Sequence, residues 1–191
     1  TGLTASEVSV EANKVVHQVL DELYTRAVLY GEPKFDRSWA TARYDALYST
    51  AGLLGPAAYR AGLTMLRTYL DRHPEADLET LVASELEFRI VYDGFVFYGY
   101  IDLVRRQDER YRVADYKSNR RLYTEEELAL DVQLGCYAYV IHTMFGVDEV
   151  DVAFEMLRHE VAQTSMRTLA EMRAAMDYLV GLARQAEHAA I

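Results

Sequence analysis

Three charged residues stand on two predicted strands in the middle of the chain: Asp102, Asp115 and Lys117. Residues i and i+2 of a strand point to the same side, so Asp115 and Lys117 share a face. Their neighbours are mostly Val, Ile, Leu, Ala and Tyr, as in a buried sheet, where charges need partners or a metal ion. Carboxylates suit a hard cation such as Mg²⁺, and the Tyr116 main-chain carbonyl offers a third oxygen. We therefore expect metal-assisted hydrolysis, with Lys117 steadying or deprotonating a water, or balancing charge on a phosphate.

A simpler interpretation of the same residues is a salt bridge between Asp102 and Lys117 at the rim of the sheet. Asp102 lies in the run Tyr-Ile-Asp-Leu-Val, and Asp115 follows Val-Ala. An ion pair alone is a costly reason to place two acids in such apolar surroundings. We therefore favour the metal site, and Glu85 on the preceding predicted strand is a further candidate ligand.

Composition limits the class of protein. The chain has 191 residues, 51% of them hydrophobic, which is typical of a single folded domain. One cysteine, Cys136, excludes a disulfide framework and a four-cysteine zinc or iron–sulfur site within the chain, and it is consistent with a reducing, cytoplasmic location. No apolar run is long enough for a membrane span. The net charge of −10 argues against a general nucleic-acid coating protein, but not against an enzyme with local positive charges.

The periodicity of apolar residues predicts an α/β fold. Helical spacing predicts helices at 8–30, 36–49, 57–72, 124–145 and 165–190, and alternation predicts strands at 81–92, 95–105, 111–117 and 149–158. The first three strands are joined by short turns, which makes an antiparallel meander. The helix that follows them is a crossover that sets the fourth strand parallel to the third. We expect a small mixed sheet flanked by helices.

Three motifs in this core resemble a known family. They are Gly99-Tyr100-Ile101-Asp102, then Asp115-Tyr116-Lys117, then Gln133 with Tyr137 on the following helix. This ordered set resembles the RecB-like exonuclease branch of the PD-(D/E)XK nuclease superfamily. The resemblance implies a restriction-endonuclease-like core in a single nuclease domain over 1–191. Within it we expect an N-terminal helical part at 1–78, a catalytic core at 79–160 and a C-terminal helix at 161–191.

The resemblance also implies roles for individual residues. Asp102 and Asp115 would bind Mg²⁺ or Mn²⁺, and Lys117 would be the catalytic lysine. Gln133 and Tyr137, four apart on one helical face, would support the active site. No iron–sulfur cluster is expected.

Two further metal ligands follow from the resemblance. His17 resembles a histidine of the family's first helix, although Asn13 stands where the family often has glycine. Glu85 resembles the acid of the family's first strand.

Local positive charges would contact the substrate. The candidates that follow the two motif strands are Arg105, Arg106, Asn119, Arg120 and Arg121. Such side chains contact phosphates rather than bases, so DNA binding would be largely independent of sequence. Tyr116 and Tyr123 are candidates for stacking on unpaired bases, although core packing is the default interpretation for most of the fifteen tyrosines.

The resulting hypothesis is a metal-dependent deoxyribonuclease that acts in DNA repair or recombination and is attached to a helicase domain or subunit. We expect an exonuclease rather than an endonuclease. The alternative is a catalytically inactive domain of the same fold that binds DNA or a protein partner. A third class, a hydrolase of small phosphoesters, is disfavoured because the chain has no phosphate-cradling glycine loop.

Overall fold

A computed structural model of the protein describes residues 5–52 and 55–189. The chain divides into two compact units. Unit 1 comprises Thr1–Leu81, Tyr116–Leu122 and Met156–Val161, and unit 2 comprises Val82–Asp115, Tyr123–Glu155 and Ala162–Ile191. No helix among the described residues combines the length and the apolarity that crossing a membrane requires.

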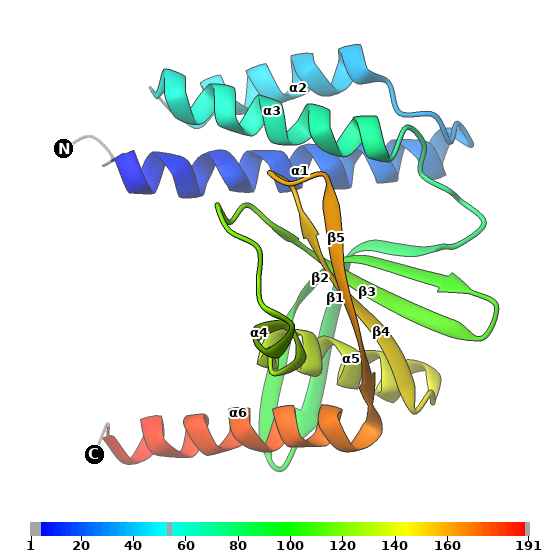
Figure 1. Ribbon diagram of the computed structural model, residues 1–191, viewed down its shortest axis with the longest axis vertical. Coiled ribbons are helices and arrows are strands. Elements are labelled where there is room, and N and C mark those ends of the chain that lie inside the picture. Colours follow the sequence, from blue (N-terminus) through cyan, green and yellow to red (C-terminus); the bar gives the residue numbers. More distant parts are fainter. Residues whose placement is uncertain (1–4, 53–54, 190–191) are drawn as a thin grey trace. The chain divides into compact units, whose positions relative to one another are not determined.

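Unit 1 is built on three helices that pack on one another: α1 (Ala5–Tyr30), α2 (Arg37–Thr50) and α3 (Pro56–Arg72) (Figure 1). The apolar stripe of α1 is confirmed, because Val16, Val19 and Leu20 are fully buried. Asp36 caps α2 by accepting a hydrogen bond from the Trp39 amide at 2.9 Å. All three helices predicted from the first part of the sequence are therefore present.

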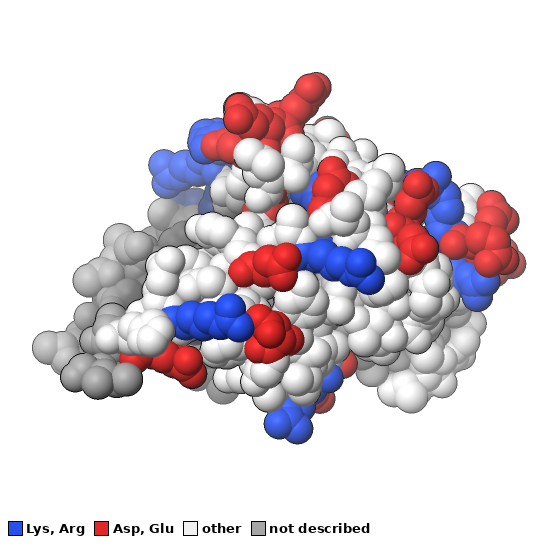
Figure 2. Space-filling model, turned by 90° about the horizontal axis from the view of Figure 1, so that it is seen from below, with Lys and Arg blue, Asp and Glu red and all other residues white. Residues whose placement is uncertain are grey.

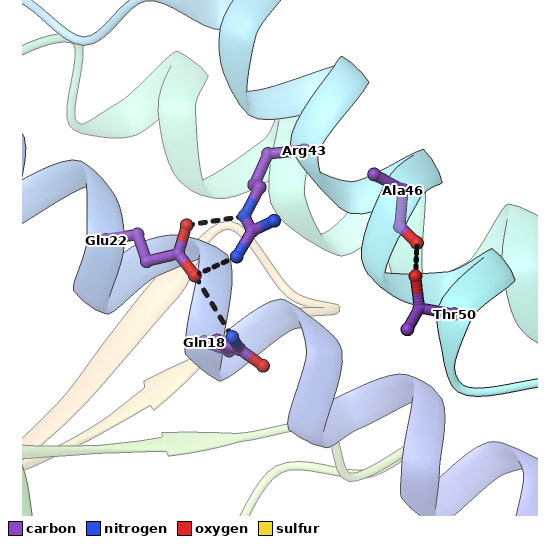
Figure 3. A network of polar contacts seen from close by, with 5 residues as sticks. All are labelled: Gln18, Glu22, Arg43, Ala46 and Thr50. Carbon is purple, nitrogen blue, oxygen red and sulfur yellow. Dashed lines mark hydrogen bonds and ion pairs between the residues drawn. The ribbon is translucent and has the colours of Figure 1, made fainter.

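A polar network ties α1 to α2 at the surface of unit 1 (Figure 3). Arg43 donates two hydrogen bonds to the Glu22 carboxylate, at 2.6 and 2.7 Å, and Gln18 donates a third at 3.0 Å. The hydrogen bond from Arg43 lowers the pKa of Glu22 below its usual value. The Thr50 hydroxyl in the same view bonds the Ala46 carbonyl of its own helix. The bidentate pair fixes how the two helices meet.

Unit 2 is organised around a five-stranded mixed sheet in the order β1-β2-β3-β4-β5, with one parallel pair. The strands are β1 (Leu81–Tyr92), β2 (Phe95–Gln107), β3 (Arg110–Lys117), β4 (Glu149–Met156) and β5 (Val161–Thr168). Asp93 and Gly94 form the β1–β2 turn, both with positive φ, 48° and 83°. That geometry is typical of a two-residue type I′ hairpin. The predicted meander of β1, β2 and β3 is confirmed.

The fifth strand corrects the sequence prediction, which placed a helix over 165–190. The chain is extended as β5 to Thr168, and α6 (Leu169–Ala189) begins only afterwards. Long-range partners hold this polar segment in the sheet. Gln163 exchanges hydrogen bonds with the backbone of Tyr123 at 2.9 and 2.8 Å. The buried Arg167 donates to the Leu128 carbonyl.

The predicted helix over 124–145 is also wrong in its middle. It is two helices, α4 (Glu125–Ala129) and α5 (Val132–Phe145). Asp131 interrupts them because its carboxylate accepts from the Leu134 amide at 2.8 Å and starts α5 as a new N-cap. The capping box between Thr124 and Glu127 is confirmed.

α5 and α6 pack closely in unit 2 (Figure 1). Gly135 permits this approach, since a Cβ added there would lie 2.5 Å from the Ala175 Cβ. Leu134, Ala138 and Ile141 of α5 are fully buried. The helix that carries Gln133 and Tyr137 is thus anchored firmly in the core of this unit.

Candidate active site

Asp102 and Asp115 lie on neighbouring strands of unit 2. In the antiparallel register of β2 and β3, Leu103 pairs with Ala114. The same register, continued by one residue, sets Asp102 opposite Asp115, and directly opposed residues of a ladder point to one face. Both residues are buried, with exposed fractions of 9% and 6%. The strands therefore present two largely dehydrated acids side by side.

Glu85 brings a third carboxylate to this face. An oxygen of its side chain lies within 4.8 Å of one from Asp102. Glu85 has a φ of +48° although it lies inside β1 and is not glycine. A left-handed backbone at such a residue costs about 1–3 kcal/mol and is found mostly at functional sites. The strand is thus distorted where its acid approaches Asp102.

Lys117 is half-buried at the end of β3. Its carbonyl accepts a hydrogen bond from the Leu157 amide at 2.9 Å, which holds the strand end in place. Alternation along β3 puts the Lys117 side chain on the face of Asp115 and turns Tyr116 to the other face.

Tyr116 is 4% exposed, and its hydroxyl lies 3.2 Å from that of Tyr69. The predicted stacking of Tyr116 on a base is therefore wrong, because the ring belongs to the core of unit 1. Tyr123 is half-buried, with its ring packed 4.5 Å from that of Phe154. The Tyr116 main-chain carbonyl stays a predicted metal ligand.

His17 lies half-buried on α1 in unit 1. Its ring meets the Tyr116 ring edge to face, with centroids 5.4 Å apart. Tyr116 directly follows Asp115 in β3. This contact gives the histidine a defined position within its unit, and its role as a metal ligand stays a prediction.

Gln133 and Tyr137 form the pair that their spacing on α5 predicts. The Gln133 amide donates to the Tyr137 hydroxyl at 2.9 Å. Burial raises the pKa of Tyr137 well above its usual value, and the negative charges of Asp115 and Asp102 raise it further. Tyr137 thus remains a neutral phenol near both acids, and its ring packs 6.0 Å from that of Phe88.

The loop after Lys117 is tied down by residues that sequence reasoning did not select. Arg158 donates to the Ser118 carbonyl at 2.6 Å, and His159 bonds the Asn119 carbonyl at 3.1 Å. Asn13 of α1 donates to the Ser118 hydroxyl at 2.5 Å. These contacts join residues far apart in the chain, so no local pattern signals them.

The predicted DNA-contacting side chains do not form one group along β3. Arg106 pairs with Tyr111 at the start of this strand, where its guanidinium also contacts the Asp108 carbonyl at 2.9 Å. Arg120 and Arg121 are exposed and follow the other end, which is about 20 Å away at the usual rise of a strand. Asn119 is exposed beside Arg120, whereas Arg105 is half-buried beside Arg106.

Surface charge on the described residues is mixed. Figure 2 shows one face of the protein, on which acidic and basic side chains lie next to each other. The arrangement agrees with the absence of a basic stripe in the sequence, and any positive charge for a substrate must be local.

The described residues thus include buried carboxylates on adjacent strands, a lysine two residues after one of them in the sequence and a hydrogen-bonded Gln–Tyr pair on α5, and the carboxylate oxygens are donors that suit a divalent metal. The family model of the PD-(D/E)XK nuclease superfamily matches residues 7–190. The chain belongs to this superfamily.

Other comparisons add little. The comparison with curated proteins found no match. Among solved structures, the chain is similar to one titled "Crystal structure of SSO0001", with 13% identity, 95% of this chain and 87% of that chain covered, and a TM-score of 0.38.

Proposed function

We propose that the protein is a metal-dependent deoxyribonuclease that hydrolyses phosphodiester bonds. The observation that carries the proposal is the row of carboxylates from Glu85, Asp102 and Asp115 on adjacent strands. Carboxylate oxygens are the ligands that Mg²⁺ and Mn²⁺ prefer, so the donor set fits either ion.

Five groups would hold the ion in this proposal. Asp102, Asp115 and the Tyr116 carbonyl are the principal ligands, with His17 and Glu85 as additional ones. A bound divalent ion supplies a more acidic water and charge stabilisation at phosphorus.

The remaining side chains act through position and charge. Lys117 would orient the attacking water and neutralise charge that builds on the phosphate. Tyr137 would donate a hydrogen bond toward the acids or the substrate because its pKa is raised, and Gln133 fixes its hydroxyl. Asn119, Arg120 and Arg121 would bind phosphates on the product or substrate strand, with Arg105 and Arg106 farther along it.

The biological setting is inferred from the resemblance to the RecB-like branch. We infer an exonuclease that acts on DNA with little sequence preference, in repair or recombination in the cytoplasm, alongside a helicase domain or subunit. The whole span 1–191 would act as a single nuclease domain.

Cleavage assays on the full chain test the proposal. We expect digestion of single- or double-stranded DNA with Mg²⁺ or Mn²⁺ and none with EDTA. Asp115→Asn and Lys117→Ala should each lower the rate by at least about 100-fold. Matched controls are Asp151→Asn, which removes a strand acid paired with Arg110, and Lys14→Ala, which removes an exposed lysine paired with Glu11.

The shape of the substrate distinguishes an exonuclease from an endonuclease. End-labelled linear DNA should be degraded, whereas closed circular DNA should persist if the enzyme is an exonuclease. Binding of DNA without cleavage in any divalent metal would instead favour the catalytically inactive alternative.

A further inference from the structure

One side of the β1–β2 hairpin is exposed and rich in large apolar side chains. Val91, Val96, Tyr98 and Tyr100 have exposed fractions of 69%, 46%, 81% and 52%. We call this side the hairpin face, and its members are Glu87, Arg89, Val91, Val96, Tyr98 and Tyr100, all exposed. A contiguous patch of exposed apolar side chains on a protein surface is typical of an interaction or ligand-binding site.

The hairpin face leads to the carboxylates. Side chains at even positions of β2 share one side, so Tyr98, Tyr100 and Asp102 form a single row. At the usual rise of a strand, Tyr100 is about 7 Å and Tyr98 about 14 Å along the row from Asp102. The two-residue turn sets the register that brings Arg89 opposite Tyr98.

The opposite side of the hairpin supports this row. Gly99 lies between the two tyrosines, and a Cβ added there would meet the Phe88 ring at 3.1 Å. Phe88 is buried and packs in turn on Tyr137 of α5. β2 therefore rests on a packed aromatic layer, so the exposed tyrosines are carried by a supported strand rather than by a loop.

We propose that the hairpin face binds an unpaired nucleic-acid strand, whose bases stack on Tyr98 and Tyr100 while a phosphate contacts Arg89. The inference rests on the proposed nuclease function and names its substrate as single-stranded. Aromatic rings accept every base, because each base has a π-face, which agrees with binding that is independent of sequence. In a duplex the bases are stacked on one another and are not open to the two rings.

Continuity with the acids favours this occupant over a protein. A protein docked on the hairpin face would cover the row that ends at Asp102, whereas a substrate strand must approach that residue. The tyrosines that the sequence suggested for stacking, Tyr116 and Tyr123, are turned into packed surroundings. Tyr98 and Tyr100 are the tyrosines of β2 that lie open to solvent on the side of Asp102.

Binding measured without cleavage tests the inference. We would titrate the full chain in EDTA into a fluorescent oligothymidylate and into a duplex of the same length, and follow anisotropy. Tyr98→Ala and Tyr100→Ala should each weaken single-strand binding about tenfold. Tyr98→Phe should stay within about twofold because the ring is kept. Tyr178→Ala, which removes a tyrosine 57% exposed on α6, is the matched control and should change nothing.

Three outcomes overturn the inference. The first is unchanged single-strand binding in both alanine variants. The second is equal weakening of duplex binding. The third is a concentration-dependent dimer in sedimentation that Tyr98→Ala abolishes, which would assign the hairpin face to a second copy of the chain. If binding depends on the tyrosines but no DNA is cleaved, the proposed nuclease function is contradicted and the single-strand site is retained. If DNA is cleaved at the same rate in both alanine variants and binding is unchanged, the single-strand site is contradicted and the nuclease function is retained.

Discussion

The tyrosines of unit 1 and those of the hairpin face have the same chemistry in opposite surroundings. In unit 1, the hydroxyls of Tyr24 and Tyr69 lie 2.7 Å apart, and that of Tyr116 is 3.2 Å from Tyr69. All three rings are buried. On β2, Tyr98 and Tyr100 are open to solvent. The comparison teaches that the buried tyrosines hold the core of unit 1 together, whereas the exposed ones are available for binding.

The close packing of Tyr44 against Gly62 gives the largest expected change in stability. A Cβ on Gly62 of α3 would lie 2.1 Å from the Tyr44 hydroxyl oxygen. Tyr44 is fully buried, and its hydroxyl donates to the Tyr59 carbonyl at 3.2 Å, so its ring has little room to move. Gly62→Ala should therefore lower the free energy of unfolding by about 3 kcal/mol, as measured by urea denaturation.

Gly181→Ala in α6 is the matched control, since it is the same change in a helix where, apart from its chain neighbours and the nearby backbone of α6, no atom of the described residues lies within 4 Å of the new Cβ. It should raise stability by about 0.5–1 kcal/mol through helix propensity. If the two variants behave alike, the close packing of Tyr44 on Gly62 is refuted.

The hydroxyl chain of unit 1 gives the next largest change. Tyr69→Phe removes the middle hydroxyl and with it the contacts to Tyr24 and Tyr116. A buried polar group that loses its partner costs about 1–3 kcal/mol, and we expect about 2 kcal/mol here. Tyr98→Phe, the same change on the hairpin face, should alter stability by less than about 0.5 kcal/mol. Equal losses in both variants would remove the distinction between the two groups of tyrosines.

The sequence predicts the strands that carry Asp102 and Asp115, but it does not predict the backbone distortion beside them at Glu85. Alternation and the Asp93-Gly94 turn predict the meander, and register then brings Asp102 and Asp115 together. These are local signals, because each depends on neighbours within one hairpin. The backbone distortion at Glu85 has no such signal, since the residue is not glycine and only its surroundings hold it at φ +48°.

The errors share a physical cause. β5 is polar and half-exposed, so its alternation is weak, and its extended form depends on Gln163 and Arg167 bonding to distant segments. In the same way, Tyr116 and Tyr98 cannot be told apart by residue type. Which of them is buried depends on whether another element packs on that side of its strand, and periodicity within the strand does not reveal it.

The ion pair between Glu22 of α1 and Arg43 of α2 should make a smaller contribution to the stability of unit 1 than its buried tyrosines. Glu22→Gln removes the charge that accepts from Arg43 in Figure 3 and should cost about 0.5–1 kcal/mol at pH 7, since the pair is partly exposed. The pKa of Glu22 is lowered in the folded state, so its contribution to stability is present above the usual carboxyl pKa of 4.5 and is lost as pH falls through the folded pKa.

The free energies of unfolding of wild type and Glu22→Gln should therefore converge below about pH 4.5. Glu11→Gln, which removes the exposed partner of Lys14, is the control and should cost little at any pH. A difference for Glu22→Gln that persists unchanged at low pH would mean that the carboxylate does not act through its charge.

Tyr92 at the end of β1 is intermediate in exposure between the two groups of tyrosines and gives the smallest expected effect. Its half-buried hydroxyl donates to the Asp177 carboxylate at 2.7 Å, and this bond raises the pKa of Tyr92 to about 12. Because the folded pKa exceeds the usual value of 10.0, the contribution to stability is complete below pH 10 and declines as pH rises from about 10 to 12. The loss in Tyr92→Phe, a few tenths of a kcal/mol at neutral pH, should therefore shrink over that range in denaturation measured at increasing pH. Other tyrosines titrate in both proteins and cancel in the difference, so a gap that widens with pH would show that Asp177 does not hold the phenol neutral.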